Sequence, residues 1–371
     1  MSRYLHIVAF DNPYPPDYGG ALDVFYKMKS LHEAGVKVIL HLYTYGRNQT
    51  KPLEPFTEKI YIYPRNKSFF RLLSSRPFIV NTRLDDGLSE NLKKDDHPVL
   101  FEGVHTTGQA GKLRERQLFL RAHNIEAEYY AQLARAEKNL LKKIYFYTEA
   151  RKLEAFEKKI VREMDGIFSV HPDEARFFRR LHPVAEWIPV FHPFEKVALS
   201  ETTEDFVLFH GNLSVAENIA AVRYLWHEVM RGLPYRFVVA GKNPPNELVR
   251  MAHRQGFVLE PNPSDRRLSE LIKNARVHLL YTEQKTGIKL KLLNVLFNGK
   301  EVIVNDKMVS RTRLEPLVQI ARSAREMQER IKEAFQKNNF DFRSVMLQRE
   351  QILSEYYNNR KNAEKLVKHV F

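Results

Sequence analysis

Short apolar segments alternate with longer amphipathic segments along most of the chain. The apolar segments predict strands at 5–10, 36–42, 59–63, 99–101, 118–121, 167–170, 206–210, 236–240, 257–259, 277–281 and 302–304. The amphipathic segments predict helices at 21–34, 125–162 with a break near Asn139, 214–230, 245–255, 265–274, 288–298 and 342–371. This alternation predicts an α/β fold built from βα units and parallel sheets.

The alternation is interrupted once, at 186–204, where prolines and hydroxyl residues follow one another without a period. Such a segment is typical of a linker. Because strands and helices resume after it, we expect two Rossmann-like domains, 1–190 and 205–340, that face a central cleft. The amphipathic tail, 341–371, is expected to be a C-terminal helix.

Composition narrows the class of protein. With 371 residues, 43% of them hydrophobic, the chain is long and apolar enough for two folded domains. No apolar run approaches the ~18–20 residues that cross a bilayer. The first ten residues are too mixed for a signal peptide, and the absence of cysteine excludes disulfides and thiolate zinc sites. A cytoplasmic protein is expected.

The net charge of +14 favours an anionic partner, although a solubilising surface would also account for it. The basic residues are spread along the chain and form no nucleic-acid motif, so we expect no nucleic-acid partner. Segment 65–78 mixes cations with large apolar residues. It fits an anionic membrane surface or a lipid-linked acceptor, which would place the protein peripherally at the inner face of the membrane; an ordinary helix with a core face is the alternative.

Open α/β sheets bind ligands at the carboxyl ends of their strands, so the loops there are the candidate sites. Gly19 and Gly20 precede the first helix and allow close approach of a ligand, although a glycine pair also suits a simple turn. His123 follows another strand and suits either a hydrogen bond to a substrate hydroxyl or packing on the sheet. Asn124 is a candidate helix cap.

Two further loops lie in the second half of the chain. Gly211 and Asn212 follow a strand, and Ser214 with Glu217 has the spacing of a capping box. The other loop, 282–291, leads into a helix whose first turn carries Lys289 and Lys291. Cations there oppose the helix dipole by ~0.3–1 kcal/mol each, and a bound diphosphate would remove the conflict.

These four loops together resemble the GT-B-fold retaining glycosyltransferases of group 1, or family 4. The most specific segment is Gly-Ile-Lys-Leu-Lys-Leu-Leu at 287–293. The resemblance implies a donor site on the second domain for a nucleotide-diphospho-sugar, an acceptor site on the first, and a C-terminal helix that crosses back to the first domain. It also implies transfer of a hexose with retention, to a glycan or lipid-linked acceptor in cell-surface polysaccharide or glycoconjugate synthesis.

Carried over by position, the resemblance gives each loop a role. His123 and Lys291 would be catalytic, His123 facing the transferred sugar and Lys291 the diphosphate. The donor-binding residues implied are Gly19, Gly20, Gly211, Asn212, Glu283, Thr286, Gly287, Ile288, Lys289 and Lys291.

The chain departs from the family pattern in two places. Where many members have two glutamates seven residues apart, this chain has Thr286 and Asn294, with Glu283 as a substitute for a sugar or ribose contact. Glu217 replaces a phosphate-binding basic residue. No Asp-x-Asp occupies a suitable loop, so we expect no metal and no cofactor, with lysines and helix N–H groups stabilising the leaving group. A nucleotide-sugar epimerase of this fold and a non-catalytic basic polyanion-binding protein are the alternatives.

Overall fold

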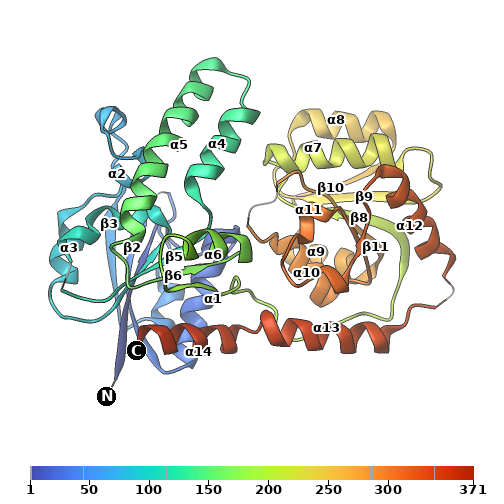
Figure 1. Cartoon of the computed structure of the whole chain (residues 1–371). Helices are drawn as coiled ribbons and strands as arrows, with labels where there is room; N and C mark the ends of the chain where they lie inside the picture. Colours follow the sequence, from blue (N-terminus) through green and yellow to red (C-terminus); the bar gives the residue numbers. More distant parts are fainter. Residues whose placement is uncertain (1, 45, 114, 285–286, 338) are drawn as a thin grey trace. The chain divides into compact units, whose positions relative to one another are not determined.

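The computed structural model describes residues 2–44, 46–113, 115–284, 287–337 and 339–371. They fold into two compact units, each built around its own parallel sheet (Figure 1). The first unit contains the chain up to Pro193 and returns at Tyr357–Phe371. The second contains most of the chain between Phe194 and Tyr356.

The sheet of the first unit has seven strands in the order β3-β2-β1-β4-β5-β6-β7, and every neighbouring pair is parallel. The strands are β1 Arg3–Ala9, β2 Val36–Thr44, β3 Lys59–Pro64, β4 Val99–Glu102, β5 Leu118–Ala122, β6 Gly166–Ser169 and β7 Ala185–Trp187. The central strands are buried on both faces, which explains why their sequences are nearly continuous apolar runs.

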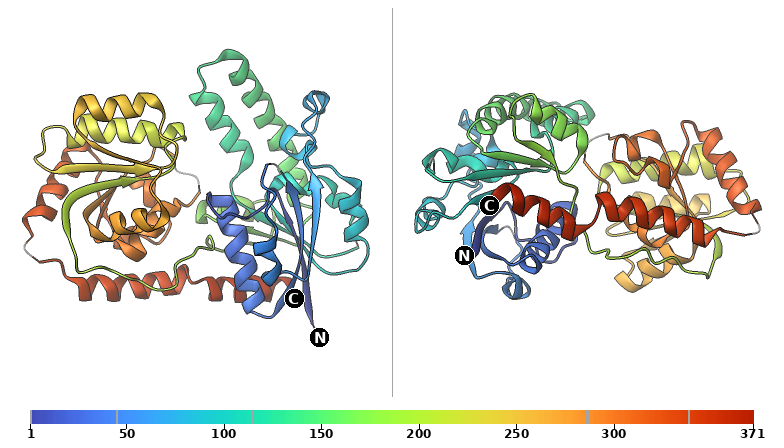
Figure 2. Two further views of the ribbon diagram at one scale, coloured as in Figure 1. Left: turned by 180° about the vertical axis from the view of Figure 1, so that it is seen from behind. Right: turned by 60° about the horizontal axis from the view of Figure 1, so that its bottom comes forward.

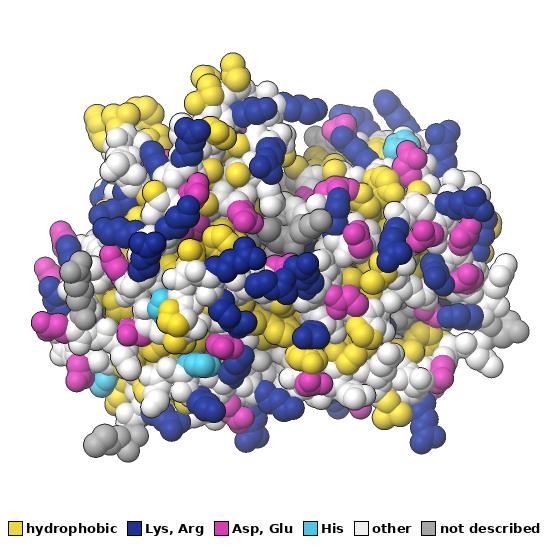
Figure 3. Space-filling model, in the orientation of Figure 1, with side chains coloured by type: hydrophobic (Ala, Val, Ile, Leu, Met, Phe, Trp, Pro, Cys, Tyr) yellow, Lys and Arg dark blue, Asp and Glu magenta, His cyan; other side chains and the backbone are white. Residues whose placement is uncertain are grey.

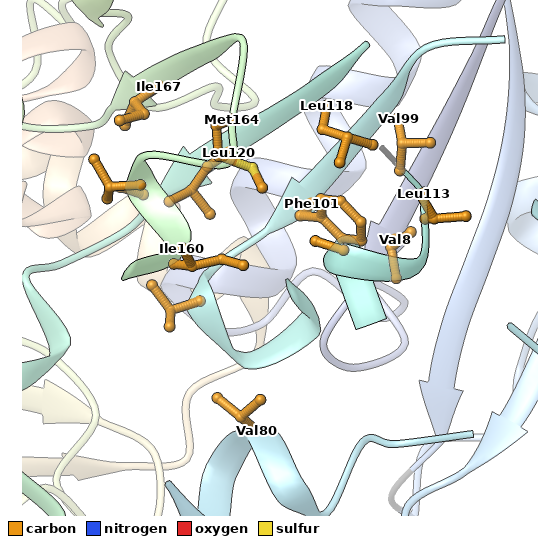
Figure 4. Packing of buried hydrophobic residues seen from close by; sticks show 14 of the residues in the cluster. Val8, Val80, Val99, Phe101, Leu113, Leu118, Leu120, Ile160, Met164 and Ile167 are labelled. Atoms are coloured by element: carbon orange, nitrogen blue, oxygen red, sulfur yellow. The ribbon is translucent and has the colours of Figure 1, made fainter. Parts of the chain in front are cut away.

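Helices cover both faces of this sheet. The α-helices are α1 Gly19–Glu33, α2 Phe78–Asn81, α3 Asp86–Leu92, α4 Glu126–Ala136, α5 Leu140–Val161, α6 Pro172–Arg179 and α14 Asn359–Val370. Three 3₁₀ segments join them, η1 Lys51–Phe56, η2 Phe69–Leu73 and η3 Val104–Lys112. On one face Val8, Phe101 and Leu120 from adjacent strands pack with Ile160 and Met164, as Figure 4 shows.

The other face of the first sheet is covered by α1 and α14, which lie against each other. Leu366 and Val370 of α14 join Met28 of α1 and Leu100 of β4 in one apolar cluster. Figure 2 shows this last helix beside α1 in both views. The C-terminal helix of the chain therefore completes the core of the first unit.

The second unit has a six-stranded sheet in the order β10-β9-β8-β11-β12-β13, again parallel throughout. Its strands are β8 Glu204–His210, β9 Arg236–Gly241, β10 Val258–Pro261, β11 Ala275–Leu280, β12 Glu301–Val304 and β13 Gln319–Ile320. Its helices are α7 Ala216–Tyr224, the π-helix η4 Leu225–Met230, α8 Asn246–Gln255, α9 Asp265–Asn274, α10 Leu290–Asn298, α11 Asp306–Val309, η5 Glu315–Leu317, α12 Ala324–Gln336 and α13 Phe342–Tyr356.

The structure corrects the expected tail helix and the expected linker, and it confirms the expected break near Asn139. The tail is two helices and not one, because the side chain of Asn358 accepts a hydrogen bond from Lys361 N and starts α14 separately. The start of the expected linker is part of the first core, where Ile188 and Phe191 are fully buried. The break near Asn139 is confirmed, since Asn139 caps α5.

Both sheets have a point at which the strand order reverses. It lies between β1 and β4 in the first unit and between β8 and β11 in the second. Loops at the carboxyl ends of these strands are where open α/β sheets hold ligands. Within the described part of the chain, every helix is too short or too polar to cross a membrane.

Candidate functional site

In the first unit, the polar residues meet at the carboxyl ends of β4 and β5. Glu102 is the last residue of β4, and His123 directly follows β5. The side chain of Glu102 is fully buried, whereas that of His123 is 13% exposed. His123 Nε2 lies 3.0 Å from Glu102 Oε2, and the imidazole meets the Phe10 ring edge-on at 5.5 Å. The carboxylate and the ring therefore fix the orientation of His123.

Glu102 belongs to a buried ion network of two acids and two bases. Lys27 Nζ lies 2.7 Å from Glu102 Oε1 and 2.9 Å from Asp23 Oδ2. Arg121 donates to both carboxylate oxygens of Asp23, at 2.9 and 3.1 Å. Burial by itself would raise the pKa of Asp23, but Arg121 and Lys27 outweigh it and hold that pKa far below its usual range. The carboxyl is therefore ionised.

The same cluster has the size of a metal site, because one ligand atom each of Asp23, Glu102 and His123 lies within 4.8 Å of the others. However, the ammonium of Lys27 already bridges the two carboxylates. A divalent ion there would have to displace a fully buried lysine and leave its charge without a partner. The donor set present therefore fits an ammonium and does not fit a metal.

The glycine pair begins α1, at Gly19. A Cβ placed on Gly20 would come within 2.5 Å of Phe10 Cζ and 3.2 Å of Tyr18 Cε2. A larger residue at position 20 would therefore force a shift of the Phe10 ring, which also contacts His123.

Asn124 does not cap α4, contrary to expectation. The cap position is Ile125, and no side chain caps the helix from within its own segment. Instead the two side-chain oxygens of Glu157, in α5, accept from the N–H groups of Glu126 and Ala127 at 2.8 and 3.0 Å. An acid from a distant helix satisfies the free amides, which spacing along α4 alone could not reveal.

In the second unit, the loop after β8 brings Gly211 and Asn212 beside α7. The predicted capping box is wrong: the cap of α7 is Val215, and the Asn212 carboxamide oxygen accepts from both Ser214 N and Ser214 Oγ. Glu217 is also engaged elsewhere, because its carboxylate accepts from the hydroxyl of Thr282 after β11. This links the loops at the two sides of the switch point.

Lys291 lies in the first turn of α10, which has Lys289 as its cap residue. Lys291 Nζ donates to Asn218 Oδ1 at 2.9 Å and lies 4.7 Å from the centre of the Phe209 ring. Across the described ranges, the structure gives Lys291 no carboxylate within ion-pair distance. Burial, reinforced by the charge of Lys289 and partly offset by Glu217, lowers the pKa of Lys291 to about 8.

Asn218 joins Lys291 to the glycine loop. A Cβ placed on Gly211 would lie 3.3 Å from the Asn218 carboxamide, which also donates to Asn212 O at 2.8 Å. Gly211, Asn212 and Lys291, three of the residues singled out in the sequence, therefore converge on one side chain.

The remaining predicted donor residues do not all join this group. Glu283 is paired with Lys307 and the Tyr281 hydroxyl, and these hydrogen bonds lower its pKa. By their contacts, Gly287 and Ile288 belong to the first unit, whereas Lys289 belongs to the second.

Thr286 and Asn294 are the positions that replace the paired glutamates. Thr286 lies outside the described residues. Asn294, the other departure from the paired glutamates, accepts from Asn298 Nδ2 through its own carboxamide oxygen at 3.0 Å.

Sequence reasoning missed several residues of both sites. Asp23 and Lys27 are spaced i, i+4 on the apolar side of a helix, and Glu102 ends an apolar strand. A charge inside an apolar pattern was the available signal. His210 is a second case: burial, with Lys291 nearby, lowers its pKa to about 3, so its imidazole is neutral.

No family model matches the chain. One curated relative, described as an uncharacterized 44.6 kDa protein in the cps region of Klebsiella pneumoniae, is 27% identical over 320 residues, which is 80% of this chain and 81% of that protein.

Solved structures match over nearly all of the chain. The GtfA/B complex matches with a TM-score of 0.67 and 11% identity, covering 100% of this chain and 99% of the other. A trehalose-6-phosphate protein of E. coli bound with UDP-2-fluoro glucose gives 0.65 and 11%, covering 99% and 98%. TarM of S. aureus, in a complex that contains UDP, gives 0.63 and 9%, covering 99% of each chain. The likeness is one of fold, and the chain has the GT-B fold.

Proposed function

We propose, from the GT-B fold and the geometry of the two sites, that the chain is a retaining, metal-independent glycosyltransferase. It would move a hexose from a nucleotide-diphospho-sugar to a glycan or lipid-linked acceptor in the synthesis of a cell-surface polysaccharide. Two of the structures with this fold hold UDP or a UDP-sugar analogue, which supports the donor class. The relative in a cps region supports the polysaccharide branch of the proposal.

The observation that carries the proposal is the state of Lys291. Its ammonium is held in the first turn of α10 by one neutral carboxamide and one aromatic face. Both the start of a helix and the ammonium favour an anion, and the described residues place no carboxylate within ion-pair distance of the ammonium. A diphosphate would accept hydrogen bonds from both and would raise the proton affinity of the lysine.

The transfer step follows from this arrangement. The bond between the anomeric carbon and the diphosphate oxygen breaks, the acceptor oxygen bonds to the same carbon, and the proton of the acceptor hydroxyl passes to an oxygen of the departing diphosphate. Negative charge accumulates on the departing nucleoside diphosphate, where Lys291 and the amides of α10 stabilise it. Such preorganised groups commonly contribute several kcal/mol to the rate, on the order of 3 kcal/mol for one donor.

His123 would act on the sugar. Glu102 engages Nε2 of the imidazole, so the other ring nitrogen is left to face a ligand hydroxyl. Since Lys27 and Arg121 neutralise the surrounding acids, the ring would sit in a fixed position before the substrate arrives. Fixed geometry of this kind lowers the entropic cost of reaching the transition state.

The test is a thermal-shift and calorimetric screen of the intact protein with UDP, GDP, ADP and their hexose derivatives. We expect one nucleoside diphosphate series to raise the melting temperature, because it binds only the folded state. Lys291→Met should weaken binding of that ligand at least tenfold, whereas Lys332→Met, an exposed lysine in α12, should bind normally. Unchanged affinity in Lys291→Met, or no stabilisation by any of these ligands, would contradict the proposal.

A further inference from the structure

Segment 65–78 holds a turn that presents aromatic and aliphatic side chains to solvent. Phe69, Phe70 and Leu73 of η2 are 70%, 80% and 75% exposed, and we call them the η2 projection. The expectation of an ordinary helix with a core face is wrong for these residues, because none of the turn is buried. Large apolar side chains gathered at this exposure indicate an interaction surface.

A second apolar projection lies at the start of α5, where the chain turns back from α4. Leu140, Leu141 and Ile144 are 70%, 79% and 52% exposed, and we call them the hairpin projection. Their i, i+1, i+4 spacing places them on one side of the helix. Lys142 and Lys143, which lie between Leu141 and Ile144 in the sequence, are also exposed and flank this face of the helix.

The two projections point from the same side of the first unit. Lys152 Nζ, in α5, donates to Leu72 O of the η2 turn at 3.1 Å, and Phe78 N donates to Glu149 Oε2 at 2.6 Å. With a rise of about 1.5 Å per residue, Glu149 and Lys152 lie about 14–18 Å along α5 from its first residue. Figure 1 shows the start of α5 and, to its left, the loop that precedes α2 both protruding upward from the first unit, and Figure 3 shows apolar side chains gathered at both places.

A basic pocket opens beside the η2 projection. It has a volume of about 570 Å³ and is lined by the cations Arg71, Arg76, Lys112 and Lys159 against the acids Asp86 and Glu163. Arg71 belongs to the η2 turn itself, so the pocket and the projection share one segment.

The cations of this pocket are only partly neutralised. Lys112 pairs with Asp86 at 3.0 Å, but the structure, over the residues it describes, pairs neither Arg76 nor Lys159 with a carboxylate. The pocket therefore carries an excess of positive charge and suits an anionic group such as a phosphate.

We propose that this side of the first unit docks onto an anionic phospholipid bilayer, with the η2 and hairpin projections inserted among the lipids and a lipid phosphate in the basic pocket. Two separate exposed apolar projections, with Arg71 beside one and Lys142 and Lys143 beside the other, fit a deformable surface of headgroups and acyl chains. A protein partner would instead require complementary hollows for both. Interfacial binding of this kind adds apolar burial to attraction by anionic lipid. The inference does not depend on the proposed enzymatic activity.

The experiment is flotation of the full chain with vesicles of phosphatidylcholine alone and with vesicles that also contain phosphatidylglycerol. We expect the protein to float only with the anionic vesicles, and less as salt increases. Phe70→Asp and Leu141→Asp should each lower binding by roughly tenfold or more, from the lost burial of one large apolar side chain. Leu347→Asp, at an exposed leucine of α13 in the other unit, is the matched control and should float like the unaltered chain.

The pocket is tested separately by charge reversal. Loss of one cation near the membrane surface is expected to lower affinity about fivefold, and Lys159→Glu should lower affinity for anionic vesicles by more than that. Lys332→Glu, in α12, should change this affinity little. Circular dichroism and melting temperature identify any variant that has failed to fold, and Lys159→Gln then takes the place of the charge reversal.

Several outcomes would overturn the inference. One is a chain that stays at the bottom of the gradient with anionic vesicles; another is an equal effect of Leu141→Asp and Leu347→Asp. Stabilisation by inorganic phosphate without vesicle binding would mean a site for a soluble anion. Self-association that Phe70→Asp abolishes, again without vesicle binding, would mean that the surface contacts a second copy of the chain.

Discussion

Lys27→Met is the most informative single change in the first unit. Methionine keeps the length and apolar stem of lysine but removes the ammonium that bridges Asp23 and Glu102 at 2.9 and 2.7 Å. At an effective dielectric constant near 20, each contact is worth about 6 kcal/mol before desolvation is subtracted. Asp23 keeps Arg121, but Glu102 is left buried with only His123 as a partner.

The net loss expected is about 3–5 kcal/mol in the free energy of unfolding of the first unit, as for other broken buried pairs. For a unit of this size the melting temperature should fall by roughly 6–20 °C. The assay is urea and thermal unfolding followed by fluorescence of Trp187, in a Trp226→Phe background so that only the first unit reports. Lys29→Met, two residues along the same helix at a partly exposed 3.9 Å pair, should cost under ~0.5 kcal/mol.

A double variant separates lost charge pairing from lost packing. In Lys27→Met/Glu102→Gln the uncompensated carboxylate is gone, so the second change should recover part of the stability lost in the first. If the free energy of unfolding of Lys27→Met instead lies within about 1 kcal/mol of that of the unaltered chain, the loss is far below the usual effect of breaking a buried pair. The ion network is then not a major source of stability. A further loss in the double variant would refute the charge argument.

Three other changes test the remaining sites. Donor affinity should fall as pH rises through the pKa of about 8 of Lys291, because the ammonium loses its proton, and calorimetry of Lys291→Arg should show a flat profile. Glu157→Ala should cost about 1–2 kcal/mol by freeing two amides of α4. Burial raises the pKa of Glu157 from 4.5 to about 8, so its protonation stabilises the folded state at acidic pH. This stabilisation is lost as the pH rises from 4.5 to about 8. In Glu157→Ala, the free energy of unfolding measured in urea should therefore depend less on pH over this range. Gly241→Ala would place a Cβ 1.9 Å from Gly211 O, so it should lower the melting temperature of the second unit, whereas Gly111→Ala, with ordinary clearance, should not.

The sequence predicts the sheet strands well because burial on both faces leaves a strong local signal. β8 has the unbroken apolar run 206–209, and β1 has an apolar run interrupted only by His6; each is an interior strand of its sheet. The alternation with amphipathic helices then implies parallel order and places the candidate loops at the carboxyl ends. Gly211 and Lys291 lie in two such loops, and in the structure both contact the side chain of Asn218, while their shared role in donor binding stays a prediction from the family resemblance.

Residues that depend on distant partners could not be assigned in the same way. The cap of α4 comes from Glu157, which is 31 positions from the amide it binds. Ser214 has the spacing of a capping residue, yet Asn212 holds its hydroxyl and Val215 takes the cap position. Local propensity is a weak guide where tertiary contacts offer a better partner.

The buried ion network shows the same limit. Nothing in the local pattern around Lys27 or Arg121 states which acid each base will meet, since the partners are set by the strand order. What the sequence does contain is the anomaly itself, a charge at a position where the pattern demands an apolar side chain.

The return of α14 to the first sheet has a consequence for synthesis of the chain on the ribosome. Leu366 and Val370 fill the core between α1 and β4, so the first unit lacks part of its interior until residues 357–371 have been made. The second unit is continuous apart from a few residues near 287 and can mature earlier. The part of the protein that is translated first therefore receives the last side chains of its apolar core only when α14 has been made.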